Sequence, residues 1–557
     1  MQGMNDLQAV RRNGFIAAMI LMMLIAFVQG FITTHDLFWA ADPDFDRDIA
    51  FAQGALEGHF GKDPSYAGEY LWYNPLLFSI EAFISKVSGL PINLVVTRAG
   101  AYLNLLGPIS FVVMVSILFN IRVALASLLS YLFFATGDIL GWGAATYSPW
   151  LYPVCFMQFV FYLNILLTYK AFKEQDIVGF LLLGLGIGLS FLGHTAPTVL
   201  IILLLIYIQG GNIMTAIKEK DYASVRKYFI QGGITFISFV VAAFPILYYV
   251  FGKYRLQLIN RATFEYSEGI FIWNNVLGMI KSNLSISFFV AIYGFIWFYR
   301  NFQNKLIRKI IFGWFFISIV MYVYSTIVAG LDSKFKIHLP GTVPSFHYFF
   351  YLKALQSVFF GFGFLQITKP LIGWISGSIK SKRPNANLVQ YSSAMLIGIV
   401  LICTILYFPF YKKRQDFVAL RENALIKSAD KGKLGVYHYI LKNISNDKVI
   451  LCDKDPSLFP VMPTGRKMVS TAYTFSNPYL SFDKRETDRL NMLSYLQNGA
   501  PHEAVSLFER YHVDYVLVSN DELNKYSNIS ALSGQPVYKN SEYTIFGITP
   551  LNKMTTY

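Results

Sequence analysis

The stretch that decides the fold runs from Gly14 to Asp48 and reads "GFIAAMILMMLIAFVQGFITTHDLFWAADPDFDRD". Residues 14–34 carry no charge, and about 20 apolar residues in a helix are enough to cross the hydrocarbon core of a bilayer. A cluster of carboxylates follows this segment almost at once: Asp42, Asp44, Asp46 and Asp48. The sequence therefore predicts a membrane helix that leads directly into an acidic loop.

The rest of the chain repeats the apolar pattern. Of its 557 residues, 54% are hydrophobic and only 14% are charged, whereas a soluble protein carries about 25% charged residues. Together these features predict a polytopic α-helical membrane protein with about 11 to 13 transmembrane helices. The predicted spans are 14–34, 75–90, 99–119, 121–139, 150–170, 178–210, 229–251, 284–299, 310–330, 347–368 and 391–410.

Positive charges predict the orientation of these spans. Arg11 and Arg12 precede the first span, and further basic clusters occur at 218–227, 300–309 and 380–383. Short loops rich in Lys and Arg stay on the cytoplasmic side. This pattern places the N-terminus in the cytoplasm. It places the loops 35–74, 252–283 and 331–346, and the tail, on the outer side of the cell membrane. It also requires residues 178–210, interrupted by "GHTAPT", to cross once with a broken piece.

A change of composition near Pro409 divides the chain into two predicted domains. Residues 1–410 form a transmembrane domain that includes the first outer loop, 35–74. Residues 411–557 are polar and regularly punctuated, and they form an extracytoplasmic domain. Short β-branched and aromatic runs predict strands, and apolar residues at helical spacing predict helices, so this domain is α/β. The predicted strands are "KVILCDKD", "KMVST", "VDYVLVS" and "YTIFGI", and the predicted helices are "RLNMLSYLQNG" and "PHEAVSLFERYH".

Several classes of function find no support in the sequence. The net charge of +14 is explained by the cytoplasmic loops, so no nucleic acid is expected as a partner. The cysteines Cys155, Cys403 and Cys452 make no disulfide framework. The sequence shows no zinc-ligand spacing, no nucleophile elbow and no nucleotide fingerprint. We therefore expect neither a metal site nor a cofactor.

The first outer loop combines its carboxylates with an amphipathic segment. "DIAFAQGALEGHF" has apolar residues at helical spacing, and such a helix can lie along the membrane interface. A carboxylate held there can take a proton from an acceptor while a second substrate arrives from the lipid. Because Asp44 and Asp48 are four residues apart, we expect them on one side of the helix and Asp46 on another. The alternative is that the acidic loop is simply solvated charge.

The order of motifs resembles the GT-C superfamily of integral membrane glycosyltransferases. Members of that family carry an acidic residue in the first outer loop, then a segment like "AQGALEGHF", then a Tyr-Pro-Pro-Leu-like entry into the second span. Here these are Asp44, the segment from Ala52, and "YNPLLF" from Tyr73, with Asn74 in place of the first proline. "YHVDYVLVS" is similar to a strand common in the soluble tails of the family.

The resemblance implies an enzyme of cell-envelope glycan biosynthesis. Similar members are the aminoarabinose transferases and the protein O-mannosyltransferases. The chain is then expected to move a sugar from a polyprenyl-phosphate-linked donor to an acceptor glycan, lipid or protein. An aspartate of the loop acts as general base for an inverting attack. Asp44 is the first choice, with Asp46 and Asp48 as the other catalytic candidates.

Cations near the outer surface are candidates for binding the donor phosphate, whose charge must be neutralised as it leaves. The segment "LDSKFKIHLPGTVPSFHYFFYLK" concentrates positive residues in a loop that should be poor in them. It could instead anchor lipid headgroups. Arg255 and Arg261 lie in a loop that could cover the donor, and Tyr73 begins the second span. The substrate-binding candidates are Lys334, Lys336, His338, His347, Lys353, Tyr73, Arg255 and Arg261.

Two further polar residues fall near breaks in the apolar segments. His194 in "FLGHTAPT" is expected to be a core histidine with satisfied hydrogen bonds. Asp138 is a second carboxylate candidate, although the charge pattern places it inside. A transporter or flippase for a lipid-linked glycan is the alternative function. Transporters usually show internal repeats and paired broken helices, whereas this sequence shows no repeat.

Overall fold

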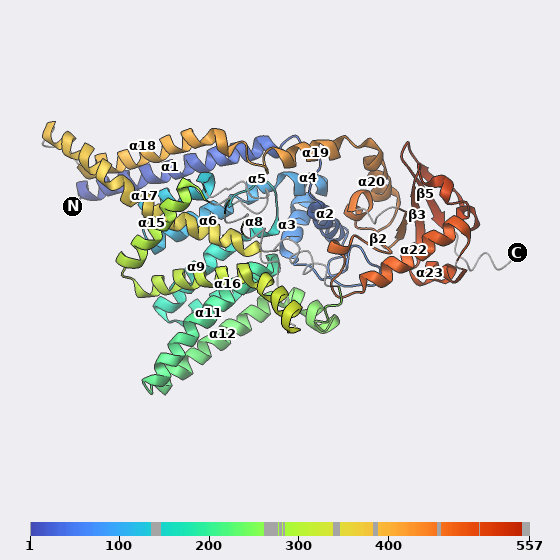
Figure 1. The fold of residues 1–557 in the computed structure, drawn as a ribbon, viewed down its shortest axis with the longest axis horizontal. Coiled ribbons are helices and arrows are strands. Elements are labelled where there is room, and N and C mark those ends of the chain that lie inside the picture. Colours follow the sequence, from blue (N-terminus) through green and yellow to red (C-terminus); the bar gives the residue numbers. More distant parts are fainter. Residues whose placement is uncertain are drawn as a thin grey trace. The chain divides into compact units, whose positions relative to one another are not determined.

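The computed structural model describes residues 2–134, 146–260, 284–337, 346–382, 388–453, 458–500 and 502–548, together with residues 277 and 281. Asp138, Arg261 and His338 from the sequence analysis lie outside these described residues. Figure 1 follows the chain from the N-terminus in blue to the C-terminal domain in red.

Helices dominate the chain from its N-terminus to residue 411. α1 and α18 come from opposite ends of this region and pack along each other (Figure 1). The bounds are α1 Gln2–Thr34, α2 Pro43–Leu56, α3 Leu76–Ser88, α4 Ile92–Arg98, α5 Gly100–Leu103, α6 Leu106–Leu118, α7 Ile121–Leu129, α8 Pro153–Phe156, α9 Gln158–Glu174, α10 Ile177–Gly193, α11 Thr195–Lys218, α12 Tyr222–Leu247, α15 Ile286–Asn301, α16 Lys305–Phe335, α17 His347–Lys382 and α18 Leu388–Tyr411.

The described residues contain 8 helices that are long and apolar enough to cross a bilayer, and two shorter apolar helices accompany them. The chain is therefore a multi-pass membrane protein, as its composition predicted. The 8 are Arg12–Thr34, Ile92–Leu118, Pro153–Glu174, Thr195–Lys218, Tyr222–Lys253, Lys305–Tyr324, His347–Ser381 and Leu388–Tyr411, and the shorter ones are Ile121–Phe134 and Ile177–Gly193.

Two predicted spans differ from the observed helices. Residues 178–210, predicted as one crossing, form two helices, α10 and α11, which meet at His194 and pack against each other. The predicted span 75–90 corresponds to α3, whose 13 residues extend about 20 Å and fall short of a hydrocarbon core of about 30 Å. Residues 178–210 add one membrane crossing to the predicted count, and residues 75–90 remove one. The total before residue 218 is therefore unchanged, and so are the predicted sides of the loops after that residue.

The chain forms two compact units. The first comprises Met1–Asp36, Arg98–Ala243 and Ser267–Leu420, and the second comprises Leu37–Thr97, Phe244–Tyr266 and Arg421–Tyr557. The acidic loop and most of the C-terminal domain therefore belong to the same unit. Whether 411–557 is the whole extracytoplasmic domain stays a prediction.

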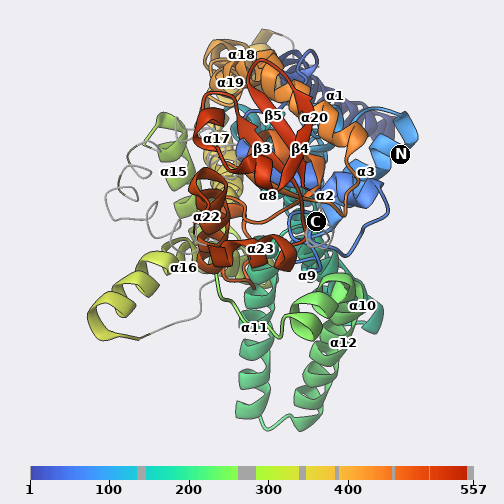
Figure 2. The same cartoon turned by 90° about the vertical axis from the view of Figure 1, so that its right-hand side faces the viewer.

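The C-terminal domain is α/β, as predicted. Its five-stranded sheet has the order β2-β1-β3-β5-β4, in which β1 pairs in parallel with β2 and β3, while β5 runs antiparallel to β3 and β4. Figure 2 shows β3, β4 and β5 among the helices of this domain. Its elements are α19 Ala419–Ala429, α20 Lys431–Asn443, β1 Val449–Cys452, α21 Leu458–Val461, β2 Lys467–Met468, α22 Phe482–Asn498, α23 Val505–Arg510, β3 Val513–Ser519, β4 Ser533–Lys539 and β5 Tyr543–Ile548.

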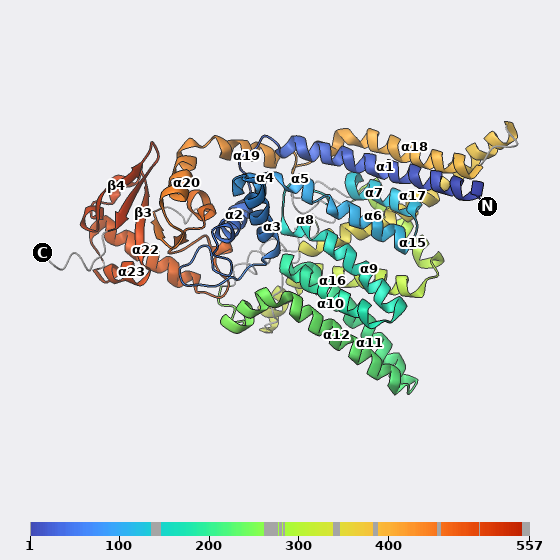
Figure 3. The same ribbon diagram turned by 180° about the vertical axis from the view of Figure 1, so that it is seen from behind.

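Alternating strand residues supply a separate core to each face of the sheet. Val449 and Leu451 of β1 join an apolar cluster with α22 and α23, whereas Ile450 and Cys452 join a cluster with α20. The second cluster also contains Ala50 of α2. Figure 3 shows α2 with α3 on one side and α20 on the other. The acidic helix is therefore packed into this compact unit.

Candidate active site

The acidic cluster begins with a well-formed helix start. The Asp42 side chain accepts a hydrogen bond from the backbone N–H of Asp44 at 2.9 Å, and Pro43 occupies the first turn. Both are favoured residues at these positions, because the first N–H groups of a helix have no partner within it. The sequence analysis placed the amphipathic segment at 48–60. The helix instead starts at Pro43, so the carboxylates Asp44, Asp46 and Asp48 all lie on α2.

Arg47 links two of these carboxylates. Its guanidinium donates to Asp44 Oδ1 at 3.2 Å and to Asp48 Oδ1 at 2.9 Å. It also donates to the Tyr73 hydroxyl at 3.0 Å, and it lies 4.3 Å from the centre of the Tyr73 ring. Asp44 and Asp48 therefore share one side of α2, as their spacing predicted. Tyr73 completes this arrangement from the segment that precedes α3.

Asp46 points elsewhere and has its own cation. Both of its carboxylate oxygens accept from Lys427 Nζ of α19, at 2.7 and 2.8 Å. The pair is buried, with side-chain exposures of 13% for Lys427 and 3% for Asp46. The ring of Phe459 lies 4.8 Å from the ammonium group. This contact joins the acidic loop to the C-terminal domain, and Asp46 is fully occupied by it.

Burial has a large effect on the titration of these groups. It raises the pKa of both Asp46 and Asp48 to about 6, against the opposing effects of Lys427 and Arg47. Repulsion from like charges contributes less than burial: from Asp42 for Asp46, and from Asp44 and then Asp42 for Asp48. Burial acts to lower the pKa of Arg47, but Asp48, Tyr73 and Asp44 together raise it above its usual value. Arg47 therefore remains charged at every working pH.

Exposure separates the three candidate bases. The Asp44 side chain is 41% exposed, whereas Asp46 and Asp48 are 2% and 3% exposed. A general base must come within hydrogen-bond distance of the proton that it takes. Asp44 can meet an acceptor hydroxyl without a rearrangement of α2, and the buried Asp46 and Asp48 cannot.

The segment "PTGRK" of the C-terminal domain holds the end of α2. Arg466 donates to Glu57 Oε1 at 2.9 Å and to the carbonyls of Ile444 and Leu441. Lys467 Nζ donates to the carbonyl of Asp63 at 2.7 Å. Both cations are buried, so their first role is to fix the first outer loop.

The segment "FSNPYLSFDKR" also contacts this loop. Asn477 donates to Asp63 Oδ2 at 2.9 Å, and Ser476 bonds the Tyr66 hydroxyl at 2.8 Å. The Arg485 guanidinium lies 4.1 Å from the centre of the Tyr66 ring. The C-terminal domain therefore fixes the acidic loop through hydrogen bonds spread over its length.

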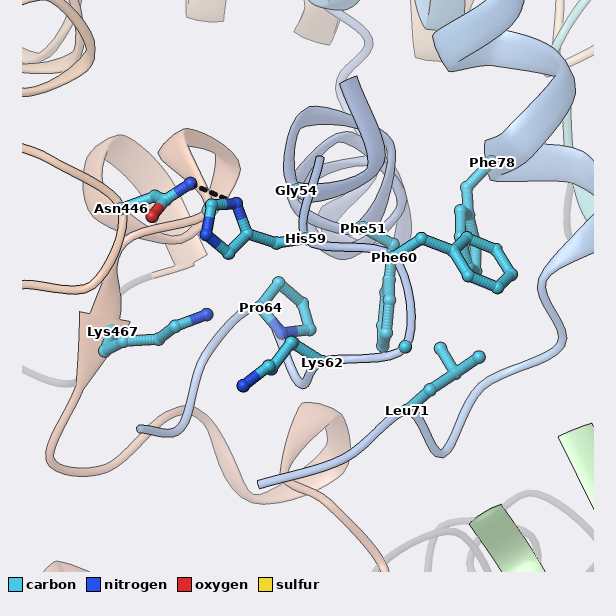
Figure 4. A pocket seen from close by; sticks show the side chains of 12 residues that line it. Phe51, Gly54, His59, Phe60, Lys62, Pro64, Leu71, Phe78, Asn446 and Lys467 are labelled. Atoms are coloured by element: carbon cyan, nitrogen blue, oxygen red, sulfur yellow. Dashed lines mark hydrogen bonds between the residues drawn. The ribbon is translucent and has the colours of Figure 1, made fainter. Parts of the chain in front are cut away.

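A small pocket lies near the end of α2. In Figure 4, His59 lies beside Asn446, with Lys62 and Lys467 nearby and the rings of Phe51, Phe60 and Phe78 across the pocket. Its volume is about 10 Å³, which is space for one water molecule. The pocket is too small for a sugar in this structure.

The predicted covering loop, 252–283, is described for residues 252–260 and, beyond these, for residues 277 and 281. Tyr254 bonds both backbone groups of Tyr70, at 2.7 and 2.8 Å, and its ring stacks on Tyr479 at 4.6 Å. Arg255, a predicted donor ligand, follows in an exposed position with a positive φ of 53°. This segment therefore packs against the first outer loop, and Arg255 makes its side chain available to solvent.

Known structures were compared with this architecture. ArnT from Cupriavidus metallidurans, solved with undecaprenyl phosphate bound, matches with a TM-score of 0.54 and 13% identity, over 95% of this chain and 97% of that one. The chain has the GT-C glycosyltransferase fold. No protein-family profile and no curated protein matches the sequence, so the sequence resemblance is confirmed at the level of fold.

Two further structures match this chain with lower TM-scores. The oligosaccharyltransferase AglB from Archaeoglobus fulgidus, in complex with an inhibitory peptide and a dolichol-phosphate, matches with a TM-score of 0.49 and 11% identity, over 97% of this chain and 74% of that one. The arabinofuranosyltransferase AftD from Mycobacteria matches with a TM-score of 0.48 and 10% identity, over 97% of this chain and 40% of that one.

The predicted phosphate ligands of the chain occupy different environments in the first unit. Lys353 of α17 is 2% exposed, and its Nζ lies 5.3 Å from the centre of the Phe349 ring. His347 is the first residue of α17 and is half-buried. Lys334 and Lys336 are exposed at the end of α16. Lys353 is therefore the cation of this set that lies inside a membrane-spanning helix.

His194 is brought to His347 by the fold. It caps α11, where its Nδ1 accepts from the backbone N–H of Ala196 at 3.1 Å, and its ring centre lies 4.8 Å from that of His347. The N-termini of α11 and α17 therefore meet at two imidazole rings. The sequence analysis treated His194 as a core histidine, and only the packing of α11 against α17 reveals the pair.

Arg47 and Lys427 are residues of the candidate site that sequence reasoning missed. Arg47 stands within the acidic run itself, and its spacing of three from Asp44 was a usable signal. Lys427 lies far from Asp46 in the sequence, and nothing local marks it.

Among the described residues, no group of three or more His, Cys, Asp or Glu side chains could hold a metal ion.

Proposed function

We propose that the chain is a glycosyltransferase that moves a sugar from a polyprenyl-phosphate-linked donor to an acceptor on the outer face of the membrane. The GT-C fold supports glycosyl transfer as the class of reaction. The predicted orientation, with the N-terminus in the cytoplasm, supports the outer face. The acceptor is a hydroxyl-bearing glycan, lipid or protein.

Asp44 is the general base in this proposal, and its geometry is the observation that carries it. It is the exposed carboxylate of a cluster in which Asp46 is bound by Lys427 and Asp48 is buried. Arg47 holds the Asp44 carboxylate through one oxygen at 3.2 Å, which leaves the other oxygen for the acceptor. Asp44 removes the hydroxyl proton, the acceptor oxygen bonds to the anomeric carbon, and the bond to the phosphate breaks on the opposite side. The configuration inverts, and a positioned base contributes roughly 10²–10⁴-fold to the rate.

Lys353, His347 and His194 bind the donor phosphate in this proposal. A buried charge within a membrane-spanning helix is costly and is usually functional. Two helix N-termini, those of α11 and α17, add their positive ends near the histidine pair. Lys334, Lys336 and Arg255 are exposed and assist the approach of an anionic lipid. The Tyr73 hydroxyl accepts a hydrogen bond from Arg47 and so holds Arg47 beside the base.

We expect Lys353→Met to lower donor turnover by about 10- to 100-fold, because a hydrogen bond to a charged group contributes about 1.5–3 kcal/mol. Methionine keeps the length and the apolar stem, so the packing of α17 is retained. The rate is measured at several donor concentrations with purified protein. Lys334→Met serves as the matched control at an exposed position, and we expect a smaller effect there. Full activity in both His347→Ala and Lys353→Met would remove this segment from the mechanism.

The function itself is tested with proteoliposomes that contain lipid extracted from the native membrane. Mass spectrometry follows polyprenyl phosphate, which appears only if the sugar–phosphate bond breaks. The expected result is its release by the wild type and a much slower release by Asp44→Asn. Movement of an intact lipid-linked glycan across the bilayer, without release, would support the flippase alternative instead.

A further inference from the structure

Glu81 is a carboxyl group on the buried side of α3. Leu77, Phe78, Glu81, Ala82 and Ser85 form the buried stripe of this helix. Glu81 is 0% exposed, and neither of its carboxyl oxygens has a hydrogen-bond partner among the described residues. Ionised carboxylates are seldom buried without a partner, because the loss of hydration costs several kcal/mol. A polar group in this position requires an explanation.

The packing of α3 on α2 brings Glu81 to the acidic site. The ring of Phe78 stacks on that of Phe51 of α2, with 5.2 Å between ring centres. Residues three apart on a helix share a face. Glu81 is three residues from Phe78 on α3, and Asp48 is three residues from Phe51 on α2. Both carboxyl groups therefore lie on the helix faces that carry this ring contact. Asp48 also has one oxygen, Oδ2, that is buried and without a partner. Because α2 packs on α3, a charge on Asp48 acts on Glu81.

The charged and titratable groups that face Glu81 are Asp48 and Arg47 of α2 and, from the adjoining segment, Tyr73. Burial, followed by repulsion from Asp48, raises the pKa of Glu81 well above its usual value. Asp48 is already paired with Arg47 at 2.9 Å. A second negative charge beside this pair would compete for Arg47, which is also the cation that holds Asp44.

We propose that Glu81 is a positioning residue of the acidic site, an uncharged carboxyl group that leaves Arg47 shared between Asp48 and Asp44. This proposal rests on the proposed function of Asp44 as the base. Glu81 does not touch the substrate. In its uncharged form, Glu81 adds no negative charge beside Arg47, so Arg47 is shared by Asp44 and Asp48 alone. When it ionises as the pH rises past its folded-state pKa, it draws Arg47 away from Asp44 and the base loses its fixed position.

The first test does not depend on activity. An acid whose pKa is raised by folding binds its proton more tightly in the folded state, so stability falls as pH rises above about 4.5 and until the folded-state pKa is passed. Glu81→Gln cannot ionise and lacks this loss. We therefore expect the unfolding equilibrium constant of the wild type, relative to the variant, to rise by up to about tenfold per pH unit in that window. Asp46 is present in both proteins and its titration cancels in the comparison, whereas the titration of Asp48 is coupled to Glu81 and forms part of the measured difference.

Thermal unfolding in detergent at several pH values provides this measurement. Glu81→Met is the second variant, for use if the glutamine variant does not fold, and it also cannot ionise. Glu503→Gln, at an exposed position in the same compact unit, is the matched control and should follow the wild type. A constant difference between wild type and both Glu81 variants at every pH would overturn the proposal, because Glu81 would then not titrate.

A second measurement tests the link to Arg47. In a double-variant cycle followed over the pH range in which the protein stays folded, the coupling between Glu81→Gln and Arg47→Met is expected to grow as pH rises, because only ionised Glu81 attracts Arg47. In the transfer assay, the loss of activity that ionised Glu81 causes as pH rises is expected to be absent in Glu81→Gln. Coupling that does not change with pH would contradict the positioning role. If neither the wild type nor any variant transfers sugar, the proposed function fails, while the unfolding and coupling results still decide the role of Glu81.

Discussion

We expect Asp44→Asn to lower the rate of sugar transfer by about 100-fold or more, which is the contribution of a positioned general base. Asparagine has the same shape and can still bond Arg47 through its carbonyl oxygen, but it cannot accept the acceptor proton. The Asp44 side chain in the Asp44–Arg47 pair is 41% exposed. Ion pairs that are exposed to solvent contribute about 0–1 kcal/mol to stability. The variant should therefore fold normally and bind the donor as the wild type does.

Asp36→Asn is the matched control for this variant. Asp36 is an acidic residue of the same region with a similar side-chain exposure of 44%, and its replacement should leave the rate unchanged. A normal rate in Asp44→Asn together with a loss in Asp48→Asn would retain the acidic cluster but assign the base to a different residue. Full activity in the Asn variants of Asp44, Asp46 and Asp48 would show that the acidic cluster has no part in catalysis.

The largest effect on stability is expected from Lys427→Met. This change leaves Asp46 buried without its cation, and removal of one partner from a buried pair costs about 3–5 kcal/mol. The loss should be larger at pH 8 than at pH 5. Burial already raises the pKa of Asp46 to about 6, so without Lys427 the folded state binds a proton there more tightly, and stability falls as pH rises. Chemical or thermal unfolding at the two pH values measures the difference.

Two further variants control this experiment. Lys525→Met removes the cation of an exposed pair with Glu522, in which Lys525 is 60% exposed, and we expect less than about 1 kcal/mol. The double variant Lys427→Met with Asp46→Asn should recover part of the lost stability, because no buried charge remains. A wild-type stability in Lys427→Met alone would show that the contact does not fix α2.

Much of the fold, and part of the candidate site, could be predicted from patterns in short stretches of the sequence. The strand at 513–519 is rich in β-branched and aromatic residues, and it forms β3. The spacing of Asp44 and Asp48 placed both on one side of α2, where Arg47 binds them. These features depend on residues that are close in sequence, so the helical spacing of residues and the strand propensity of side chains are sufficient to find them.

Features that depend on distant contacts were not predictable in the same way. The partner of Asp46 is Lys427, and only the packing of α19 brings the two together. Glu81 interrupts an otherwise apolar stripe, a signal that was present in the sequence but has no meaning until α3 lies against α2. The segment 178–210 was assigned one crossing from charge alone, yet His194 ends one helix and caps another. The strand β4, with Pro536 and mostly exposed residues, lacks the apolar alternation by which strands are recognised.

The central claim is that this chain breaks the bond between a sugar and a polyprenyl phosphate. The most direct measurement is the fate of that bond in proteoliposomes loaded with donor lipid whose sugar carries an isotopic label at the anomeric carbon. We predict that the wild type transfers the labelled sugar with inversion and releases polyprenyl phosphate, and that Asp44→Asn does neither at a comparable rate. A donor whose sugar–phosphate bond stays intact, in the presence of folded wild-type protein and native acceptor lipids, would contradict the account.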